Sequence, residues 1–320
     1  MNGMDKRKLG NSGFSVAPLA LGGNVFGWTA DEATSHAILD RFVDTGFALV
    51  DTANMYSTWV PGHKGGESEA IIGKWLAKSG KRDRVVLATK VGMEVEGEKG
   101  LTRSQVAKHV ELSLKRLRTD RIDLYQTHKD DPATPVDETL EALDRLVKAG
   151  KVRAIGASQY GADRLVESLA ASKRLGIARY ETLQPELNLY DRRAFEQELR
   201  PVAEKHGLAV IPFFGLAKGF LSGKYRKPED IRGRPREGGL KRYFEGGRGM
   251  RILAALDAVG ARVGGTPAQV SLAWSMAQPT VVAPIVSATS VAQLEELMGA
   301  ARVKLDPDSL AELDAASREG

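Results

Sequence analysis

Four reactive side chains follow apolar segments of the sequence. Asp51 and Tyr56 follow one such segment, Lys90 ends the next, and His128 ends the one after it. A carboxylate, a phenol, an ammonium and an imidazole are groups that transfer or orient protons in enzymes. A fold that gathers the ends of its strands at one mouth would bring these four groups together.

The four groups suit the reduction of a carbonyl compound, in which hydride reaches the carbon and a proton reaches the oxygen. A phenol has an ordinary pKa of about 10 and is therefore a weak acid near neutrality. A neighbouring ammonium stabilises the phenolate and lowers this pKa. We therefore expect Tyr56 to be the general acid and Lys90 to lower the pKa of Tyr56. Asp51 would hold Lys90 in place, and His128 would orient the carbonyl oxygen.

Eight short apolar segments alternate with amphipathic segments along the chain. The apolar segments predict strands over Leu19–Leu21, Phe47–Asp51, Val85–Lys90, Ile122–His128, Ala154–Ser158, Thr182–Glu186, Leu208–Phe214 and Val281–Val286. Helical spacing of apolar residues predicts helices over Asp31–Thr45, Glu67–Lys78, Arg103–Leu117, Val136–Ala149, Ala162–Arg174, Arg192–His206, Met250–Val263 and Pro267–Ala277. This alternation predicts parallel strands that are joined by crossover helices.

The spacing of the predicted strand ends indicates a repeated unit. Ends at positions 51, 90, 128, 158, 186 and 214 lie 28 to 39 residues apart, which suits one strand, loop and helix per interval. Eight such units form a (β/α)₈ TIM barrel, so we predict an α/β protein with one barrel domain over residues 1–320. We also predict an N-terminal β-hairpin, with strands over Lys8–Leu9 and Phe14–Val16, and a long loop after strand 7.

A doubly wound sheet is the main alternative to the barrel. Its dinucleotide fingerprint, G-x-G-x-x-G after a strand, occurs nowhere in the chain. The phosphate-binding loop of nucleotide hydrolases is also missing, because the run Gly219–Lys224 has the wrong spacing and no Ser or Thr after its Lys. The barrel is therefore the favoured prediction.

The composition suits a soluble globular protein, with 42% hydrophobic and 27% charged residues among 320. The chain has no cysteine, which excludes disulfides and thiolate metal sites, and nothing in the sequence suggests another metal site. No signal peptide and no apolar stretch long enough to span a bilayer are visible. We therefore expect a cytoplasmic protein without a membrane partner.

The net charge of +5 is concentrated in one part of the sequence. From Lys224 to Arg251 there are ten basic and four acidic residues, so this segment carries +6. Such a segment is either a solvated loop or a local field for a ligand that bears phosphate. Nucleic acid is the less favoured partner, because the rest of the chain is near neutral and has no nucleic-acid motif. We expect a small-molecule partner, and the oligomeric state stays open.

The order and type of these motifs resemble the aldo-keto reductase superfamily over residues 6 to 315. The resemblance rests on the runs Val50–Tyr56, Ala88–Lys90 and Leu124–His128, in that order, and is nearest to the potassium-channel β-subunit-like and bacterial long-loop branch. It implies the barrel fold and the NAD(P)H-dependent reduction of aldehydes and ketones, or the reverse oxidation. It also implies that the catalytic tetrad consists of Asp51, Tyr56, Lys90 and His128.

The resemblance further implies a set of nucleotide-binding residues. Ser158, Gln159 and Gln184 would bind the nicotinamide carboxamide, although Gln159 replaces the usual Asn. Phe213 would stack on the nicotinamide, and Lys224 would reach the phosphates. Thr289, Gln293 and Glu296 would hold the adenosine end. The other implied contacts are Gly22, Gly23, Asn24, Asp51, Phe214 and Leu216.

The nucleotide and the substrate are less sharply defined. We expect NADPH, which the family favours, but residues 287–297 have no Lys or Arg for a 2′-phosphate, so NADH is a second candidate. Trp28, Met55 and Trp59 would line an apolar pocket for a small hydrophobic or aromatic carbonyl compound. Two other functions stay open. One is a lyase that uses Lys90 as a Schiff-base nucleophile, and the other is a nucleotide-binding module that senses redox state and regulates a partner.

Overall fold

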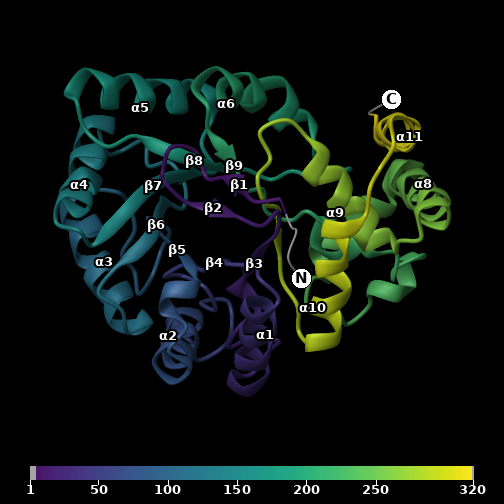
Figure 1. Cartoon of the computed structure of the whole chain (residues 1–320), viewed down its shortest axis with the longest axis horizontal. Helices are drawn as coiled ribbons and strands as arrows, with labels where there is room; N and C mark the ends of the chain where they lie inside the picture. The colour runs from purple at the N-terminus through teal and green to yellow at the C-terminus, as the bar shows by residue number, and fades with distance from the viewer. Residues whose placement is uncertain (1–4, 319–320) are drawn as a thin grey trace.

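A curled sheet of eight parallel strands forms the centre of the computed structural model, which describes residues 5–318 (Figure 1). The strands are β3 (Ala20–Gly22), β4 (Leu49–Asp51), β5 (Val86–Val91), β6 (Ile122–Thr127), β7 (Val152–Ser158), β8 (Tyr180–Gln184), β9 (Ala209–Val210) and β10 (Ile285–Val286). Their order is β10-β3-β4-β5-β6-β7-β8-β9, so neighbours in the chain are neighbours in the sheet. This is the order of a (β/α)₈ barrel.

The two edges of the sheet meet and close the barrel. Val210 of β9 forms a parallel bridge with Val281, just before β10. The Val282 N–H donates to the Val210 carbonyl at 2.8 Å, and the Ile285 N–H donates to the Pro212 carbonyl at 2.8 Å. The predicted α/β barrel is therefore confirmed, and no open edge separates β9 from β10 at this level.

Helices surround the barrel (Figure 1). The longer ones are α1 (Glu32–Asp44), α2 (Glu67–Ser79), α3 (Arg103–Leu117), α4 (Val136–Lys148), α5 (Ala162–Leu175), α6 (Arg200–His206), α8 (Arg248–Val263), α9 (Pro267–Ala277), α10 (Val291–Met298) and α11 (Pro307–Ser317). Local signals set their ends: Asp31 caps α1 by accepting from the Thr34 N–H at 2.8 Å, and Thr266 and Gln269 form a capping box on α9. No helix within residues 5–318 is both long and apolar enough to cross a membrane.

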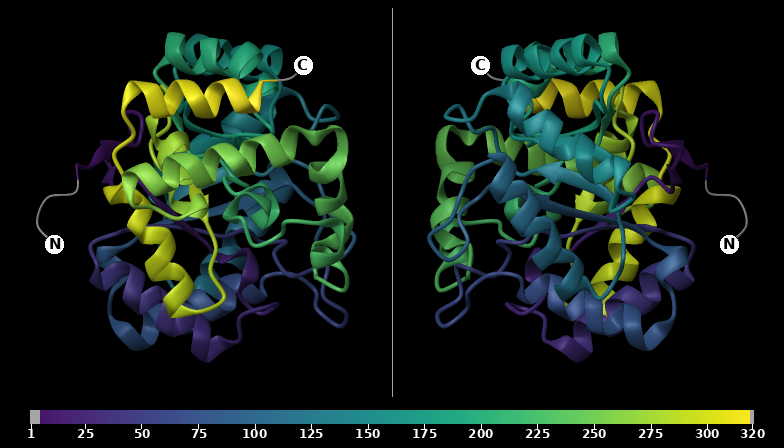
Figure 2. Two further views of the ribbon diagram at one scale, coloured as in Figure 1. Left: turned by 90° about the vertical axis from the view of Figure 1, so that its right-hand side faces the viewer. Right: turned by 90° about the vertical axis from the view of Figure 1, so that its left-hand side faces the viewer.

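The N-terminal hairpin closes one end of the barrel. Its strands β1 (Arg7–Lys8) and β2 (Ser15–Val16) are antiparallel, as expected from the sequence. Leu9 and Val16 are completely buried and belong to the same apolar cluster as the small residues inside the barrel, such as Ala88 and Ala154. The hairpin and the loop before α8 lie at opposite ends of the barrel (Figure 2). The other end is therefore the one available for a site.

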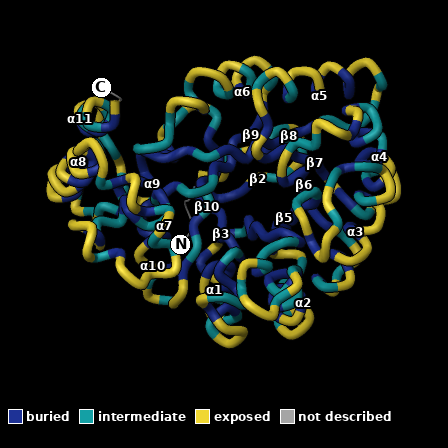
Figure 3. Tube along the Cα trace, turned by 180° about the vertical axis from the view of Figure 1, so that it is seen from behind, coloured by how far each residue is buried: buried dark blue, intermediate teal, exposed yellow. Residues whose placement is uncertain are grey.

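A second and larger apolar cluster lies between the strands and the helices. All six residues of β5 and all six of β6 are buried, because the barrel interior covers one face and the helices cover the other. Figure 3 shows this layering, with buried strands inside and exposed residues along the outer sides of the helices. A polar side chain inside such a barrel needs hydrogen-bonding partners there. The mouth of the barrel contains several such polar side chains.

Several boundaries differ from the sequence prediction. The helix expected over Arg192–His206 is divided into a π-helix, η3 (Phe195–Leu199), and α6. Pro201 lies in the first turn of α6 and has no N–H to donate, so a regular helix cannot run through it. The strand expected over Leu208–Phe214 is shortened to β9, and Pro212 interrupts its hydrogen-bonding ladder for the same reason. Helices α10 and α11 were not among the predicted ones.

Candidate active site

The predicted reactive residues lie at the carboxyl ends of neighbouring strands. Asp51 ends β4, Lys90 lies near the end of β5, and His128 follows β6 directly. Parallel register aligns these ends: Asp51 pairs with Ala88 across β4 and β5, and Lys90 pairs with Gln126 across β5 and β6. The barrel thus brings side chains that are 77 residues apart in sequence to one mouth.

Lys90 is the centre of the polar cluster. Its Nζ donates to Asp51 Oδ2 at 2.6 Å, to the Thr52 carbonyl at 2.9 Å and to Tyr56 Oη at 2.8 Å. The Lys90 side chain is completely buried and the Asp51 side chain almost so. All three protons of the ammonium are used, and the carboxylate, the ammonium and the phenol form one connected chain of hydrogen bonds.

Two amides support Asp51 from the far side. Its Oδ1 accepts from Gln126 Nε2 at 3.1 Å and from Gln184 Nε2 at 3.0 Å. Gln184 Nε2 also lies 3.1 Å from Gln126 Oε1. Gln126 was not among the predicted site residues, although an amide two residues before His128 on a buried strand is a signal that it faces the same interior. Gln184, expected to bind nicotinamide, uses its amide nitrogen here, so its Oε1 is the atom left for a ligand.

Burial and charge determine the pKa values in this cluster. Burial alone would lower the pKa of Lys90, but Asp51 and Tyr56 outweigh it, and the pKa is raised. Lys90 is therefore an ammonium. Burial raises the pKa of Tyr56 and outweighs the opposing effect of Lys90. Lys90 thus lowers the pKa of Tyr56, as expected from the sequence, but burial and the charge of Asp51 outweigh this effect, and the net pKa is raised.

His128 lies beside the phenol as a neutral imidazole. Its ring centroid is 5.8 Å from that of Tyr56, in an edge-to-face arrangement. Burial first, and the charge of Lys90 second, hold the pKa of His128 well below its usual value. Its Nδ1 is buried and has no hydrogen-bond partner among residues 5–318. A neutral imidazole can therefore offer a hydrogen bond to a ligand oxygen without carrying a charge.

A deep cleft of about 970 Å³ opens at this mouth. Tyr56, His128 and Asp51 line it, whereas Lys90 lies beneath its floor. Every residue expected to bind the nucleotide or the substrate lines the same cleft except Gly23. A Cβ on Gly23 would lie 2.7 Å from Ser68 Oγ, so packing behind the cleft wall requires glycine there. Residues that are far apart in the sequence thus form one continuous surface of the cleft.

Ser158 and Gln159 lie where β7 ends. Ser158 Oγ donates to the Gln184 carbonyl at 2.9 Å, which joins the ends of β7 and β8. Gln159 has a left-handed backbone, with φ of 53°, and its Nε2 donates to the His128 carbonyl at 3.0 Å. Gln is longer than the usual Asn, and the side chain of Gln159 folds back onto the end of the neighbouring strand. Its Oε1 is left for a ligand.

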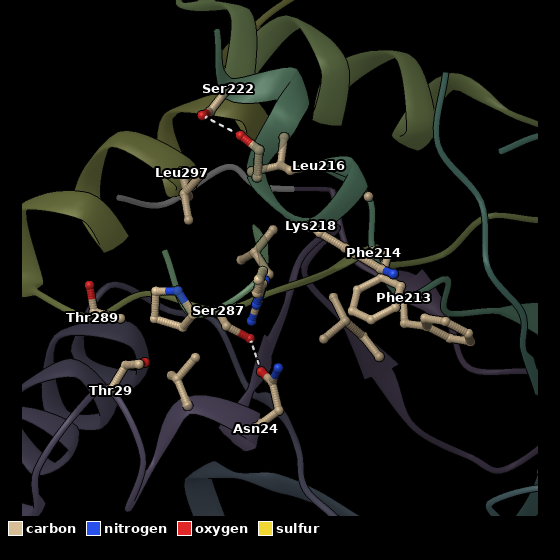
Figure 4. Close-up of a pocket in the computed structure, with 18 of the residues that line it drawn as sticks. Asn24, Thr29, Phe213, Phe214, Leu216, Lys218, Ser222, Ser287, Thr289 and Leu297 are labelled. Atoms are coloured by element: carbon tan, nitrogen blue, oxygen red, sulfur yellow. Dashed lines mark hydrogen bonds between the residues drawn. The ribbon is translucent and has the colours of Figure 1, made fainter. Parts of the chain in front are cut away.

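The loop after β9 forms one wall of the cleft (Figure 4). It turns through three non-glycine residues with positive φ, Phe214 at 55°, Ala217 at 46° and Lys218 at 59°. Lys218 Nζ lies 5.5 Å from the centre of the Phe214 ring, and the Phe213 ring packs edge-to-face on the Phe214 ring at 5.1 Å. Strained backbone of this kind is concentrated at binding sites, where surrounding structure holds it.

The segment that leads into α10 forms the opposite part of the wall. The Thr289 N–H donates to Gln293 Oε1 at 2.8 Å, and Thr266 Oγ1 donates to Glu296 Oε1 at 2.9 Å. Ser287 donates to Asn24 Oδ1, which ties this segment to the loop after β3 (Figure 4). The polar groups at this end of the cleft are thus preorganised by one another.

Aromatic rings cover the outer side of the mouth. The Trp59 ring lies 6.0 Å from the Tyr56 ring and 5.6 Å from the Trp28 ring, both edge-to-face. Trp59 is 42% exposed although it lines the cleft together with Met55. The Trp28 and Trp59 rings thus form an apolar surface beside the Tyr56 phenol.

Fold and site together define a (β/α)₈ barrel with a lysine–carboxylate–phenol cluster at its carboxyl mouth. Residues 18–318 match the model of the Aldo/keto reductase family, and the chain belongs to this family. Membership places the protein among the NAD(P)H-dependent oxidoreductases of carbonyl compounds.

Full-length relatives agree with this assignment. The chain is 36% identical to "Uncharacterized oxidoreductase YrpG" of Bacillus subtilis (strain 168), over 96% of this chain and 94% of that protein. It is 32% identical to "Protein tas" of Escherichia coli (strain K12), over 98% and 97%. It is 31% identical to "Probable voltage-gated potassium channel subunit beta" of Arabidopsis thaliana, over 94% and 92%. The branch expected from the sequence is therefore confirmed.

Proposed function

We propose that this protein is an NADPH-dependent reductase of small hydrophobic or aromatic aldehydes and ketones, with Tyr56 as its general acid. One observation carries the proposal: a phenol that lines the cleft accepts a 2.8 Å hydrogen bond from a buried ammonium, which a buried carboxylate holds at 2.6 Å. This arrangement can release and recover a proton at the Tyr56 oxygen while the ammonium stays charged.

The donors and surfaces of the cleft fit a nicotinamide dinucleotide. Ser158, Gln159 and Gln184 offer amide and hydroxyl groups at one end, and Phe213 offers a ring face beside them. Lys218 and Lys224 supply positive charge for phosphates, and Thr289 and Gln293 supply polar groups for the adenosine end. When bound, the dinucleotide supplies the hydride that reaches the carbonyl carbon.

The residues of the chain would then handle the carbonyl oxygen. His128, neutral and with one unbonded nitrogen, would orient this oxygen toward Tyr56. Tyr56 would donate its proton as negative charge develops there. Lys90 would stabilise the resulting phenolate at a distance of 2.8 Å, and Asp51 would keep Lys90 in position. Trp28 and Trp59 would cover the apolar part of the substrate and exclude water.

The lyase alternative fits this geometry poorly. A Schiff base requires a neutral amine, but the pKa of Lys90 is raised, and all three of its donors are engaged in hydrogen bonds. The side chain is also completely buried below the cleft floor. The alternative of a regulatory nucleotide-binding module gains support from the relatives named as channel subunits, and a turnover experiment separates it from an enzyme.

A paired titration with NADPH and NADH, followed by turnover of 4-nitrobenzaldehyde, tests the proposal. We expect nucleotide binding by fluorescence, tighter for NADPH, and oxidation of the nucleotide when the aldehyde is added. Tyr56→Phe should lose about three orders of magnitude in kcat while its Kd for NADPH stays within about twofold. Tyr190→Phe is the matched control, since its hydroxyl donates to the Arg242 carbonyl and does not line the cleft. Tight NADPH binding without turnover across a panel of carbonyl compounds would favour the regulatory module.

A further inference from the structure

His109 contacts two loops that border the cleft, although it does not line the cleft itself. It belongs to α3, and its side chain is buried. The loop between β4 and α2, residues 52–66, carries the phenol and is here named the Tyr56 loop. The loop between β5 and α3, residues 92–102, carries Met93, which lines the cleft. The imidazole contacts one residue of each loop.

The contact with the Tyr56 loop is made by Asn54. Asn54 Nδ2 lies 3.3 Å from His109 Nδ1, and both side chains are buried. An amide nitrogen only donates, so Nδ1 accepts, and the neutral ring carries its proton on Nε2. Burial lowers the pKa of His109, which agrees with a neutral ring. His109 is therefore a hydrogen-bond acceptor for the Tyr56 loop.

The other ring nitrogen of His109 faces the second loop. His109 Nε2 lies 3.6 Å from Glu98 Oε2, and Lys108 Nζ holds the Glu98 carboxylate at 2.6 and 2.7 Å. A carboxylate on this side favours the ring form that carries its proton on Nε2. Glu98 thereby keeps Nδ1 free of a proton, as the contact with Asn54 requires.

Asn54 depends on this contact. Its Oδ1 is buried and has no hydrogen-bond partner among residues 5–318, and its Nδ2 has no partner in that range besides His109. Its backbone N–H donates to the Lys90 carbonyl at 3.2 Å, so the same residue also joins the Tyr56 loop to β5. Without His109 the amide would be fully buried with neither polar group paired, which favours a shift of the loop.

A shift of Asn54 would reach Tyr56, because the chain between them is tightly turned. The Tyr56 N–H donates to the Ala53 carbonyl at 3.2 Å. Ser57 has a left-handed backbone, with φ of 78°, and its Oγ donates to the Phe26 carbonyl at 3.1 Å. A non-glycine residue keeps this conformation only where the surrounding structure holds it. Asn54 and His109 are part of that surrounding structure.

We propose that His109 is a positioning residue that holds the Tyr56 loop, through Asn54, in the arrangement needed for proton transfer to the carbonyl oxygen. The inference rests on the proposed function, because it concerns the position of the proposed general acid. Misplacement of a reacting group by about 1 Å lowers a rate by about 100-fold. Neither His109 nor Asn54 lines the cleft, so nucleotide binding should be spared.

The test uses variants that differ in which ring nitrogen they replace. His109→Asn offers an amide oxygen near the place of Nδ1, His109→Gln places its amide near that of Nε2, and His109→Leu offers neither. Asn54→Ala removes the other partner. His36→Leu is the matched control, because His36 lies on α1, contacts the Ile71 carbonyl at 3.1 Å and does not line the cleft. Each variant is compared by the single-turnover rate with 4-nitrobenzaldehyde, the Kd for NADPH and the melting temperature.

We expect His109→Leu and Asn54→Ala to lower the single-turnover rate by about 10- to 100-fold, with the Kd for NADPH within about twofold of the wild type. The double variant should lose no more than either single variant, because both residues act through one contact. His109→Asn should recover most of the rate, and His109→Gln should not.

Two outcomes would overturn the inference. One is a wild-type rate in His109→Leu with only a lower melting temperature, which would show a purely structural role. The other is an equal rate in His109→Asn and His109→Gln, which would show that the acceptor at Nδ1 does not matter. If His109→Leu does not fold, the comparison of His109→Asn with His109→Gln decides the question.

Hydrogen exchange of residues 54–60, measured by mass spectrometry, separates failure of this inference from failure of the proposed function. If the wild type reduces no carbonyl compound but exchange is faster in His109→Leu than in His36→Leu, the proposed function fails while the hold on the loop is supported. If the wild type reduces 4-nitrobenzaldehyde and His109→Leu matches His36→Leu in both exchange and rate, this inference alone fails.

Discussion

Asp51 Oδ1, at the end of β4, accepts a hydrogen bond at 3.1 Å from Nε2 of Gln126, which lies on the non-adjacent strand β6. β5 lies between them, so the contact crosses the interior of the barrel. Gln184 reaches the same oxygen from β8 at 3.0 Å. The carboxylate that holds Lys90 is thus fixed from two further strands, and its position does not depend on the loop that follows it.

This relationship predicts a cost for Gln126→Leu. The change leaves Asp51 with one amide donor fewer and leaves Gln184 without its Gln126 partner, so buried polar groups lose hydrogen bonds. We expect the free energy of unfolding, measured by urea denaturation, to fall by about 1–3 kcal/mol. Turnover should fall as well, because Lys90 is held less rigidly. Gln197→Leu is the control, since that side chain is exposed in η3. Equal stability of the two variants would count against the support role.

A second prediction concerns the buried ion pair. Lys90→Met removes the ammonium and leaves the Asp51 carboxylate buried with amide partners only, which should cost about 3–5 kcal/mol of unfolding free energy. The double variant Lys90→Met with Asp51→Asn removes both charges and should be more stable than Lys90→Met alone. Denaturation of the wild type, of Lys90→Met, of Asp51→Asn and of the double variant measures the coupling. A double variant that is less stable than Lys90→Met would contradict this account.

The sequence predicted the barrel and the position of the tetrad because both depend on local patterns. A buried strand is a short apolar run, and the residue after it lies at the mouth by the geometry of parallel strands. Asp51, Lys90 and His128 could therefore be placed together from spacing alone. The same patterns do not show which groups a side chain contacts across the barrel, which is why the support of Asp51 by Gln126 was not predicted.

Two other differences between the prediction and the structure arise from tertiary contacts and burial, which no local sequence pattern shows. The net pKa shift of Tyr56 depends on how much water the folded mouth excludes, and the motif around Tyr56 says nothing about this. Arg236 was counted only as one charge of a basic segment. Its guanidinium lies 5.7 Å from the centre of the Trp28 ring, a contact between parts of the chain that are far apart in sequence.

His128 predicts a stability change with pH. Its pKa is well below the ordinary value of about 6.5 that it takes in the unfolded chain, so the unfolded state binds the proton first as the pH falls. The stabilisation is therefore complete above pH 6.5 and is lost as the pH falls below it. The loss is at most about 1.4 kcal/mol per pH unit for this group. His128→Gln should flatten the dependence between pH 7 and 5.

Urea denaturation at several pH values measures this slope. The pKa values of His109 and His206 are also lowered by burial, so the slope of His128→Gln should be reduced and not abolished. Parallel pH dependences for the wild type and His128→Gln would show that the folded protein accepts the proton at His128, contrary to the burial described above.

Trp59 predicts a change in substrate affinity. The indole is exposed at the mouth and packs on the Tyr56 ring at 6.0 Å, so a bound aromatic aldehyde would gain apolar contact with it. Trp59→Ala should raise the KM for 4-nitrobenzaldehyde by about tenfold and leave the Kd for NADPH nearly unchanged. Leu112→Ala removes an exposed apolar side chain from α3 and serves as the control. An unchanged KM would remove Trp59 from the proposed pocket.

The raised pKa of Tyr56 predicts different pH profiles for the two directions of the reaction. Below this pKa the phenol keeps its proton, so reduction of 4-nitrobenzaldehyde should have a nearly constant kcat from pH 6 to 9. Oxidation of the corresponding alcohol by NADP⁺ needs the phenolate, so its kcat should rise by about one log unit per pH unit over the same range. Stopped-flow measurement of the single turnover separates this step from nucleotide release. If the oxidation rate instead reaches a plateau below pH 8, Lys90 outweighs burial, and the pKa of Tyr56 is lowered.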